Sequence, residues 1–173
     1  MDAKQLRQNQ AVLKARYKQR PESATLTLRA RGRVLQNDVA LKIETGHGKV
    51  TAGLHPYTGG SGELACSGDM MLESLAACAG VTLGAVATAL GVAIREGYVH
   101  VEGELDFRGT LGMDKSVPVG FRAIRLRFDI DSDASPDQLD TLLKLTERYC
   151  VIFQTLRQPP AVSVSLERAG VTA

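Results

Sequence analysis

The 173-residue chain has no tryptophan, few aromatic residues and almost no excess of charge of either sign. Aromatic residues make up 5% of the sequence, and the formal net charge is +2. A protein that stacks bases and neutralises phosphates needs more aromatic residues and more positive charge, so a nucleic-acid partner is not expected. The three cysteines are too few, and odd in number, for a secreted disulfide scaffold. They are therefore the residues whose presence most needs an explanation.

The remaining composition is that of an ordinary folded domain. The chain is 44% hydrophobic and 23% charged, and a chain of this length buries roughly 70% of its extended surface. We expect one α+β domain over residues 23–173, preceded by a basic helical arm over residues 1–22. The arm is interpreted as a solvated helix in preference to a contact for a partner. Its cations are Lys4, Arg7, Lys14, Arg16, Lys18 and Arg20.

The sequence predicts neither export nor a membrane span. The N-terminal residues lack the apolar core of a signal peptide, so we expect a cytoplasmic protein. Residues 74–94 carry no charge and are long enough to cross a bilayer, but they are rich in Ala, Gly, Thr and Ser. We interpret this segment as part of a buried central helix over residues 69–93. Ser67 is its expected N-cap, and Asp69 lies in its first turn.

Alternating apolar and polar residues predict the strands. Turn residues Asn37 and Asp38, and then residues 46–48, join the first three strands into an antiparallel meander. The predicted strands are residues 24–34, 39–44, 49–53, 98–108, 121–130 and 161–167.

The sequence also marks a second helix after the fifth predicted strand. Ser135, Pro136 and Gln138 form the start of this helix, with a capping box. The helix extends to about residue 157, and the sequence allows a break near residues 149–150. The order of strands, helix, strands, helix and strand defines the α+β class.

Common catalytic and metal-binding signatures are missing. The sequence contains no HExxH, no P-loop and no paired CxxC. His47, His55 and His100 lack ligand spacing and are interpreted as turn or surface residues, so no metal site is expected. The glycine-rich residues 59–62 precede the central helix and leave an anion-binding module as a weaker alternative.

Two of the cysteines lie in predicted helices. Cys78 is in the central helix and Cys150 is late in the second helical region. Each alone is typical of a small core residue, because free cysteines are among the most buried residues. Two thiols on helices of one core are candidates to meet, as a nucleophile and a resolving partner. Cys66, at the end of the glycine-rich loop, is interpreted as an incidental free thiol.

Residues 68–78 (GDMMLESLAAC) and 147–152 (ERYCVI) resemble the two cysteine segments of the OsmC/Ohr-type family of cysteine-based hydroperoxide reductases. The order of elements is similar as well, over about residues 23–168. The resemblance implies antiparallel sheets around two long central helices in an intertwined homodimer, with active sites at the dimer interface. It implies no metal or flavin.

The resemblance also implies thiol-dependent reduction of organic hydroperoxides to alcohols. Cys78 would attack the O–O bond and become a sulfenic acid, which Cys150 would convert into a disulfide. A dithiol reductant of the dihydrolipoyl type would then reset the pair.

A buried thiol has a raised pKa, so a nucleophilic Cys78 needs a cation nearby. Family members supply an arginine held by a glutamate, but here Gly68 occupies the position of that glutamate. Its absence favours an alternative, a non-catalytic dimeric protein that binds a small apolar ligand. The candidates to activate the thiolate are Arg29, Arg31 and Arg33 on the first strand, and the candidate supporting acids are Asp69 and Glu73.

Overall fold

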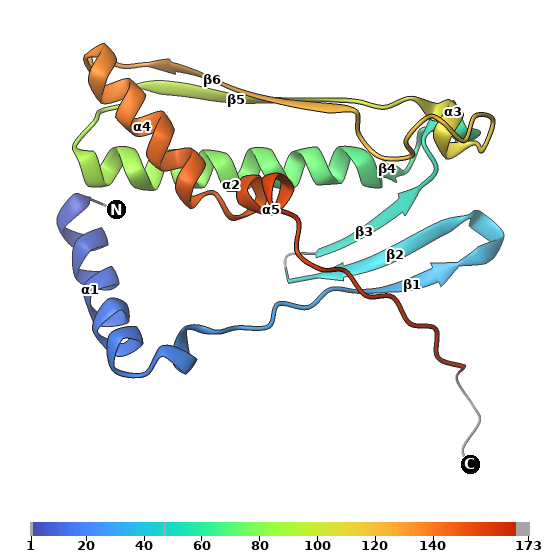
Figure 1. The fold of residues 1–173 in the computed structure, drawn as a ribbon, viewed down its shortest axis with the longest axis horizontal. Coiled ribbons are helices and arrows are strands. Elements are labelled where there is room, and N and C mark those ends of the chain that lie inside the picture. The colour runs from blue at the N-terminus through green and yellow to red at the C-terminus, as the bar shows by residue number, and fades with distance from the viewer. Residues whose placement is uncertain (1, 47, 169–173) are drawn as a thin grey trace.

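A computed structural model of the chain describes residues 2–46 and 48–168. These residues form an α+β fold with a four-stranded sheet, a two-stranded sheet and helices packed beside them (Figure 1). His47, expected in a turn, lies outside the described residues. The elements in chain order are α1 (Ala3–Gln19), η1 (Pro21–Ala24), β1 (Arg31–Leu35), η2 (Gln36–Asp38), β2 (Ala40–Thr45), β3 (Gly48–Gly53), η3 (Pro56–Thr58), β4 (Ala65–Cys66), α2 (Ser67–Leu90), β5 (Glu96–Glu104), α3 (Phe107–Thr110), β6 (Ala123–Asp131), α4 (Pro136–Tyr149) and α5 (Val151–Arg157).

The predicted antiparallel meander is confirmed in β1, β2 and β3, with β4 added parallel to β3. The first strand is shorter than predicted, because residues 25–30 are outside any strand and pairing begins at Arg31. Leu26 and Leu28 remain 79% and 84% exposed. Alternation identifies residues suited to a sheet, but a strand also needs a neighbouring strand, and the described residues provide none for this segment.

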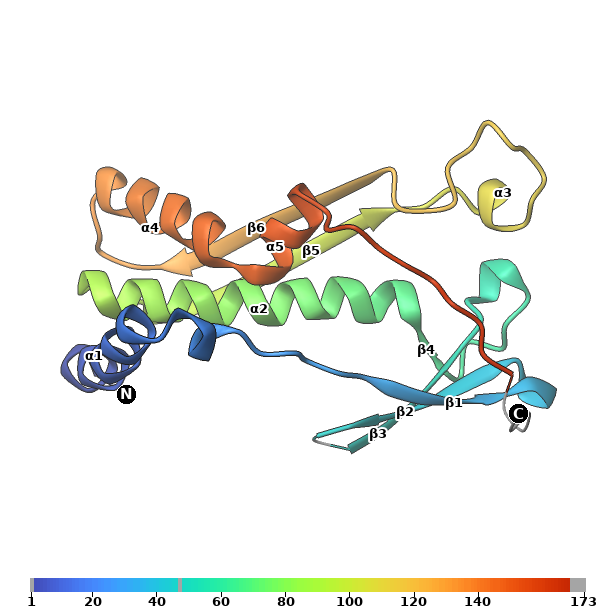
Figure 2. The ribbon, with the colours of Figure 1, turned by 60° about the horizontal axis from the view of Figure 1, so that its bottom comes forward.

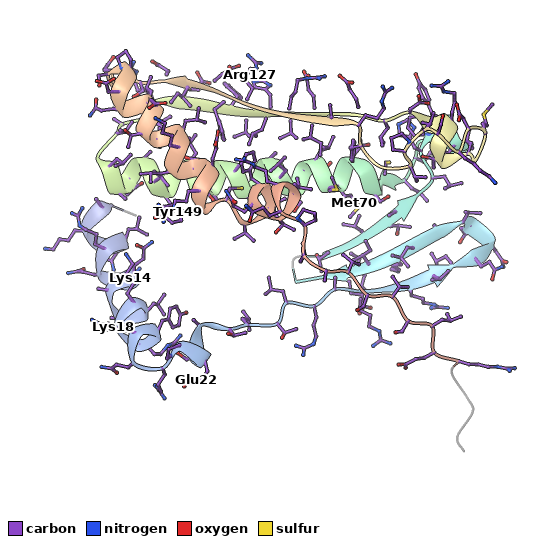
Figure 3. The ribbon with its side chains drawn as sticks, in the orientation of Figure 1. Lys14, Lys18, Glu22, Met70, Arg127 and Tyr149 are labelled. Carbon is purple, nitrogen blue, oxygen red and sulfur yellow. The ribbon has the colours of Figure 1, made fainter. Side chains whose placement is uncertain are left out.

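Strands β5 and β6 form a long antiparallel ribbon that lies along α2 (Figure 2). Val99, Val101 and Phe128 face the core, as the alternation predicts. Strand β5 was predicted as residues 98–108, but it begins at Glu96 and ends at Glu104, and Phe107 begins α3. Arg127 lies on the face away from α2 (Figure 3) and bonds the exposed Asp129.

Helix α2 begins and ends earlier than predicted. Cys66, not Ser67, is the N-cap, because Cys66 is still extended as part of β4. The helix ends at Leu90 and not at residue 93, because Gly91 adopts a left-handed conformation with φ 73°. The residues of its buried face recur every four positions, and they are Leu75, Ala79, Leu83 and Ala87.

By length and composition alone, α2 is apolar enough to cross a membrane. The core helix of a globular fold passes the same test, and here α2 packs against β5, α4 and α5. We therefore describe it as the core helix. The prediction of a buried central helix is only partly right, because this chain covers one face of α2 and leaves Val81 75% exposed on another.

The second helical region follows the prediction closely. Ser135 accepts the Gln138 N–H and Gln138 reaches back to Ser135, so the capping box is confirmed. The break also occurs: α4 ends at Tyr149, Cys150 is extended with ψ 108°, and α5 begins at Val151. Figure 3 places Tyr149 at this corner.

The predicted last strand over residues 161–167 is wrong for the single chain. These residues form no strand, and Val164 and Leu166 are 94% and 100% exposed. The physical reason is the one that shortens the first strand, because no strand within residues 2–46 and 48–168 pairs with the segment. Helix α1 also stays outside the core, with no buried residue, and lies apart from the β5–β6 ribbon (Figure 1).

Candidate active site at Cys78 and Cys150

The structure brings Cys78 and Cys150 together at the junction of α2 with the α4–α5 corner. Cys150 is 1% exposed and belongs to a core cluster with Leu75 and Ala79. Cys78 is half-buried and packs against this cluster. The sequence-based hypothesis that the two thiols meet is therefore supported by their positions, and neither is in a disulfide.

The corner itself is built by hydrogen bonds on both sides of Cys150. Its N–H donates to the Thr146 carbonyl at 3.0 Å and closes α4, while its carbonyl accepts the Gln154 N–H at 2.9 Å and opens α5. The extended backbone of Cys150 changes the helix direction between these two bonds. As a result, the first amides of α5 are directed at the sulfur of Cys78.

The pKa of Cys78 lies below that of an ordinary thiol. Burial alone raises this pKa, but four donors around the sulfur reverse its effect. In order of size these are the Ile152 N–H, the Cys150 S–H, the Val151 N–H and the Thr82 hydroxyl. The Thr82 hydroxyl, one turn further along α2, lies 2.8 Å from the Cys78 carbonyl oxygen, so its single proton is shared between that carbonyl and the sulfur. Hydrogen bonds to the charged form thus favour a Cys78 thiolate.

The pKa of Cys150 is shifted in the opposite direction. Burial raises it first, and the hydrogen bond to Cys78 and the charge on that sulfur raise it further, against lowering by the Phe153 and Ile152 N–H groups. Cys78 therefore loses its proton before Cys150 does. The geometry places a thiol of lowered pKa next to a thiol of raised pKa, which is the order of deprotonation that a sulfenic acid and a resolving cysteine require.

The three arginines predicted to activate the thiolate lie elsewhere in this chain. Arg31 and Arg33 are on β1 and line a depression of the four-stranded sheet, and the Arg29 guanidinium donates to the Thr27 carbonyl. Within the described residues, no guanidinium is among the groups that shift the pKa of Cys78. Their activating role stays a prediction.

The two candidate supporting acids also stay predictions. Asp69 is in the first turn of α2 and Glu73 lies one turn later, both exposed to solvent. Cys66 is half-buried at the start of α2, where it lines a small pocket with His55 and Asp69. This pocket shares no residue with the cluster around Cys78 and Cys150.

Sequence reasoning missed the donors that the structure provides. Thr82 was detectable, because a hydroxyl four residues after a helical cysteine faces it across one turn. The Val151 and Ile152 N–H groups were not, because every residue except proline has such a group and only the corner aims these two at a sulfur.

An apolar cleft of about 600 Å³ lies against the cysteine cluster. Leu75, Phe128 and Phe153 belong to both the cleft and the cluster. Its charged members are Glu147 and Arg157, and the Arg157 guanidinium lies 5.7 Å from the centre of the Phe153 ring. The cleft can hold an apolar molecule close to the two thiols.

The histidines have other local partners. The His55 Nδ1 accepts the Tyr57 N–H at 3.1 Å, and the His100 Nε2 lies 3.0 Å from a carboxylate oxygen of Asp129. Within residues 2–46 and 48–168, no group of three or more His, Cys, Asp or Glu residues is placed to hold a metal ion.

The fold and the site together define an α+β protein with two adjacent thiols of opposite pKa shift between its core helix and a helix corner. The chain belongs to the OsmC-like protein family, whose sequence model matches residues 60–165. This range includes both cysteines of the pair. No curated protein matches the chain.

Solved structures of this family share the fold. An OsmC-like protein from Mycoplasma pneumoniae has a TM-score of 0.63 and 21% identity, with 78% of this chain and 91% of that chain covered. The organic hydroperoxide resistance protein OsmC from Legionella pneumophila has a TM-score of 0.59 and 18% identity, with coverages of 77% and 90%. An organic hydroperoxide resistance protein from Elizabethkingia anophelis, with thiocyanate bound, has a TM-score of 0.60 and 14% identity, with coverages of 78% and 91%.

Proposed function

We propose that this protein reduces organic hydroperoxides to alcohols, with Cys78 as the peroxidatic cysteine and Cys150 as the resolving cysteine. The observation that supports this most directly is the hydrogen-bonded thiol pair, in which the pKa of Cys78 is lowered and that of Cys150 is raised. The names of the Legionella and Elizabethkingia proteins agree with this substrate class.

The reaction has two steps on the protein. The Cys78 thiolate attacks one oxygen of the hydroperoxide, the O–O bond breaks, and an alkoxide leaves and takes up a proton. Cys78 is thereby oxidised to a sulfenic acid, and the hydroperoxide is reduced to an alcohol. The Cys150 sulfur then attacks the Cys78 sulfur, which forms a disulfide and releases water.

The disulfide needs a reductant before the next cycle. Thiol–disulfide exchange with a dithiol, of the dihydrolipoyl type in our proposal, returns both cysteines to thiols and leaves the reductant as a cyclic disulfide. A pair that must be reset in this way fits a reducing compartment, so we propose a cytoplasmic location.

We further propose that the working form is a homodimer. Two segments with strand-like alternation, residues 25–30 and 161–167, have exposed apolar side chains and no strand partner in the described chain. Val81 is exposed on the open face of α2. A second copy that pairs with these segments and covers α2 would bury them, and it is the expected source of Arg29, Arg31 or Arg33 beside Cys78.

The test is mass spectrometry of the reduced protein after one equivalent of tert-butyl hydroperoxide. We expect a disulfide between Cys78 and Cys150, and the Cys66→Ser variant should give the same product because Cys66 is remote from the pair. Unchanged thiols at Cys78 and Cys150, or oxidation confined to Cys66, would contradict the proposal.

The apolar cleft supports a second candidate, a dimeric protein that binds a small apolar ligand without chemistry. This function uses Leu75 and Phe153 but neither sulfur. It predicts that an apolar fluorescent probe binds equally well to the wild type and to the Cys78→Ser variant, while hydroperoxide leaves all thiols intact.

A further inference from the structure

The side chain of Gln154 spans the corner at Cys150. It lies on α5, is half-buried, and its Nε2 donates to the Glu147 carbonyl of α4 at 2.7 Å. The backbone N–H of the same residue donates to the Cys150 carbonyl at 2.9 Å. Gln154 thus contacts the backbone on both sides of the break through two separate groups.

The bond to Glu147 replaces one that the break removes. In an uninterrupted helix the Val151 N–H would donate to the Glu147 carbonyl, and the Ile152 N–H would donate to the Arg148 carbonyl. Here both N–H groups are directed at the Cys78 sulfur instead. The Glu147 carbonyl, which loses its helical donor in this way, receives the Gln154 side chain.

We infer that Gln154 is a positioning residue, which stabilises the break at Cys150 and so keeps the Val151 and Ile152 N–H groups available to the Cys78 sulfur. Its relevance to turnover rests on the proposed function. Its effect on the two N–H groups follows from the hydrogen bonds alone. Without a side-chain donor at position 154, the Glu147 carbonyl is satisfied best by the Val151 N–H, which extends α4 through Cys150 and removes donors from Cys78.

The experiment is the pH profile of iodoacetamide alkylation at Cys78, followed by mass spectrometry of the peptide that contains it. Gln154→Met keeps the length of the side chain and removes the donor. We expect the midpoint of its profile to move to higher pH, and the alkylation rate at neutral pH to fall about tenfold. The matched control is Gln158→Met, which changes an exposed glutamine one turn later on the chain and should leave the profile unchanged.

A second variant separates positioning from general damage. Gln154→Asn keeps the amide but is one methylene shorter, so it cannot span to Glu147 and should shift the profile in the same direction. Far-UV circular dichroism and the melting temperature establish that each variant is folded at the temperature of the assay. Folded Gln154→Met and Gln154→Asn proteins with the wild-type profile would overturn the inference.

Alkylation requires no hydroperoxide, so this test is independent of the proposed function. A shifted Gln154→Met profile in a protein that forms no disulfide with hydroperoxide would retain the inference and reject the peroxidase. An unshifted profile in a protein that does form the disulfide would reject the inference and retain the peroxidase.

Discussion

The S–H of Cys150 donates a hydrogen bond to the sulfur of Cys78, across the contact between the core helix and the corner that joins α4 to α5. This bond couples the two thiols. Burial raises the pKa of both thiols, but the Ile152 N–H and then this bond lower the pKa of Cys78, whereas the same bond adds to the raised pKa of Cys150. The order in which the two thiols lose their protons follows from these effects together.

Substitution of Cys78 and substitution of Cys150 are expected to leave different oxidation products. Cys150→Ser leaves the Cys78 nucleophile but no resolving thiol, so one equivalent of hydroperoxide should leave a sulfenic acid on Cys78 that dimedone traps. Cys78→Ser removes the nucleophile and should abolish both the adduct and the peroxide consumption. Mass spectrometry distinguishes the two products. A dimedone adduct on Cys150 in the Cys78→Ser protein would show that the roles are reversed.

As the pH rises, Cys78 should become reactive toward an alkylating reagent before Cys150 does. Because the pKa of Cys78 is lowered and that of Cys150 is raised, the Cys78 thiolate persists at a pH where Cys150 is still protonated. Its alkylation should decline as the pH falls through the pKa of Cys78, while alkylation of Cys150 should begin only at higher pH. Iodoacetamide labelling between about pH 5 and about pH 10 measures both. Equal midpoints for the two peptides would contradict the assignment.

Thr82→Val should weaken Cys78 as a nucleophile without disturbing the helix. The substitution replaces the hydroxyl, which donates toward the Cys78 sulfur, with a methyl group of similar size. Loss of one donor to a thiolate should slow alkylation at neutral pH several-fold. Thr88→Val is the matched control, because Thr88 makes the same bond to a carbonyl one turn earlier, that of Gly84 at 2.8 Å, away from the thiols. Equal slowing by both variants would assign the effect to the helix.

The dimer proposal predicts that a charge on one face of the segment at residues 161–167 weakens the dimer, whereas the same charge on the other face does not. Val164 is 94% exposed in the single chain, and a second copy would bury it. Val164→Lys should therefore shift sedimentation equilibrium toward the monomer. Ser165→Lys adds the same charge on the opposite face and should leave the dimer intact. A wild-type protein that sediments as a monomer, or equal effects of the two variants, would refute the proposal.

The core between α2 and α4 can be tested with two neighbouring leucines. Leu142 is 1% exposed and belongs to the core cluster around α2, whereas Leu143 is 42% exposed at the cleft. Leu142→Ala should lower the free energy of unfolding by about 2–5 kcal/mol, measured by urea denaturation, because it leaves a cavity. Leu143→Ala should cost less than half as much. A larger loss at Leu143 would place the core on the other side of α4.

Much of the fold was predictable because the patterns that encode it are local. Ser135, Pro136 and Gln138 mark the start of α4, and the alternation around Val101 and Phe128 marks the ribbon that covers α2. The two largest errors, in the first and last predicted strands, have one cause. Residues 25–30 and 161–167 alternate like strands, but alternation does not reveal whether a neighbouring strand is available.

The sequence alone indicated that Cys78 lies in the core helix and Cys150 late in the second helical region, and it allowed a break near residues 149–150, which the structure places at the extended Cys150. It could not determine what activates Cys78, because the expected partner was a charged side chain and the observed donors are two main-chain N–H groups, a hydroxyl and a thiol. A main-chain N–H is present at nearly every residue, so only its direction distinguishes it. Tertiary structure decides that direction, because an extended Cys150 between two helices frees the first amides of α5 and brings them to the sulfur.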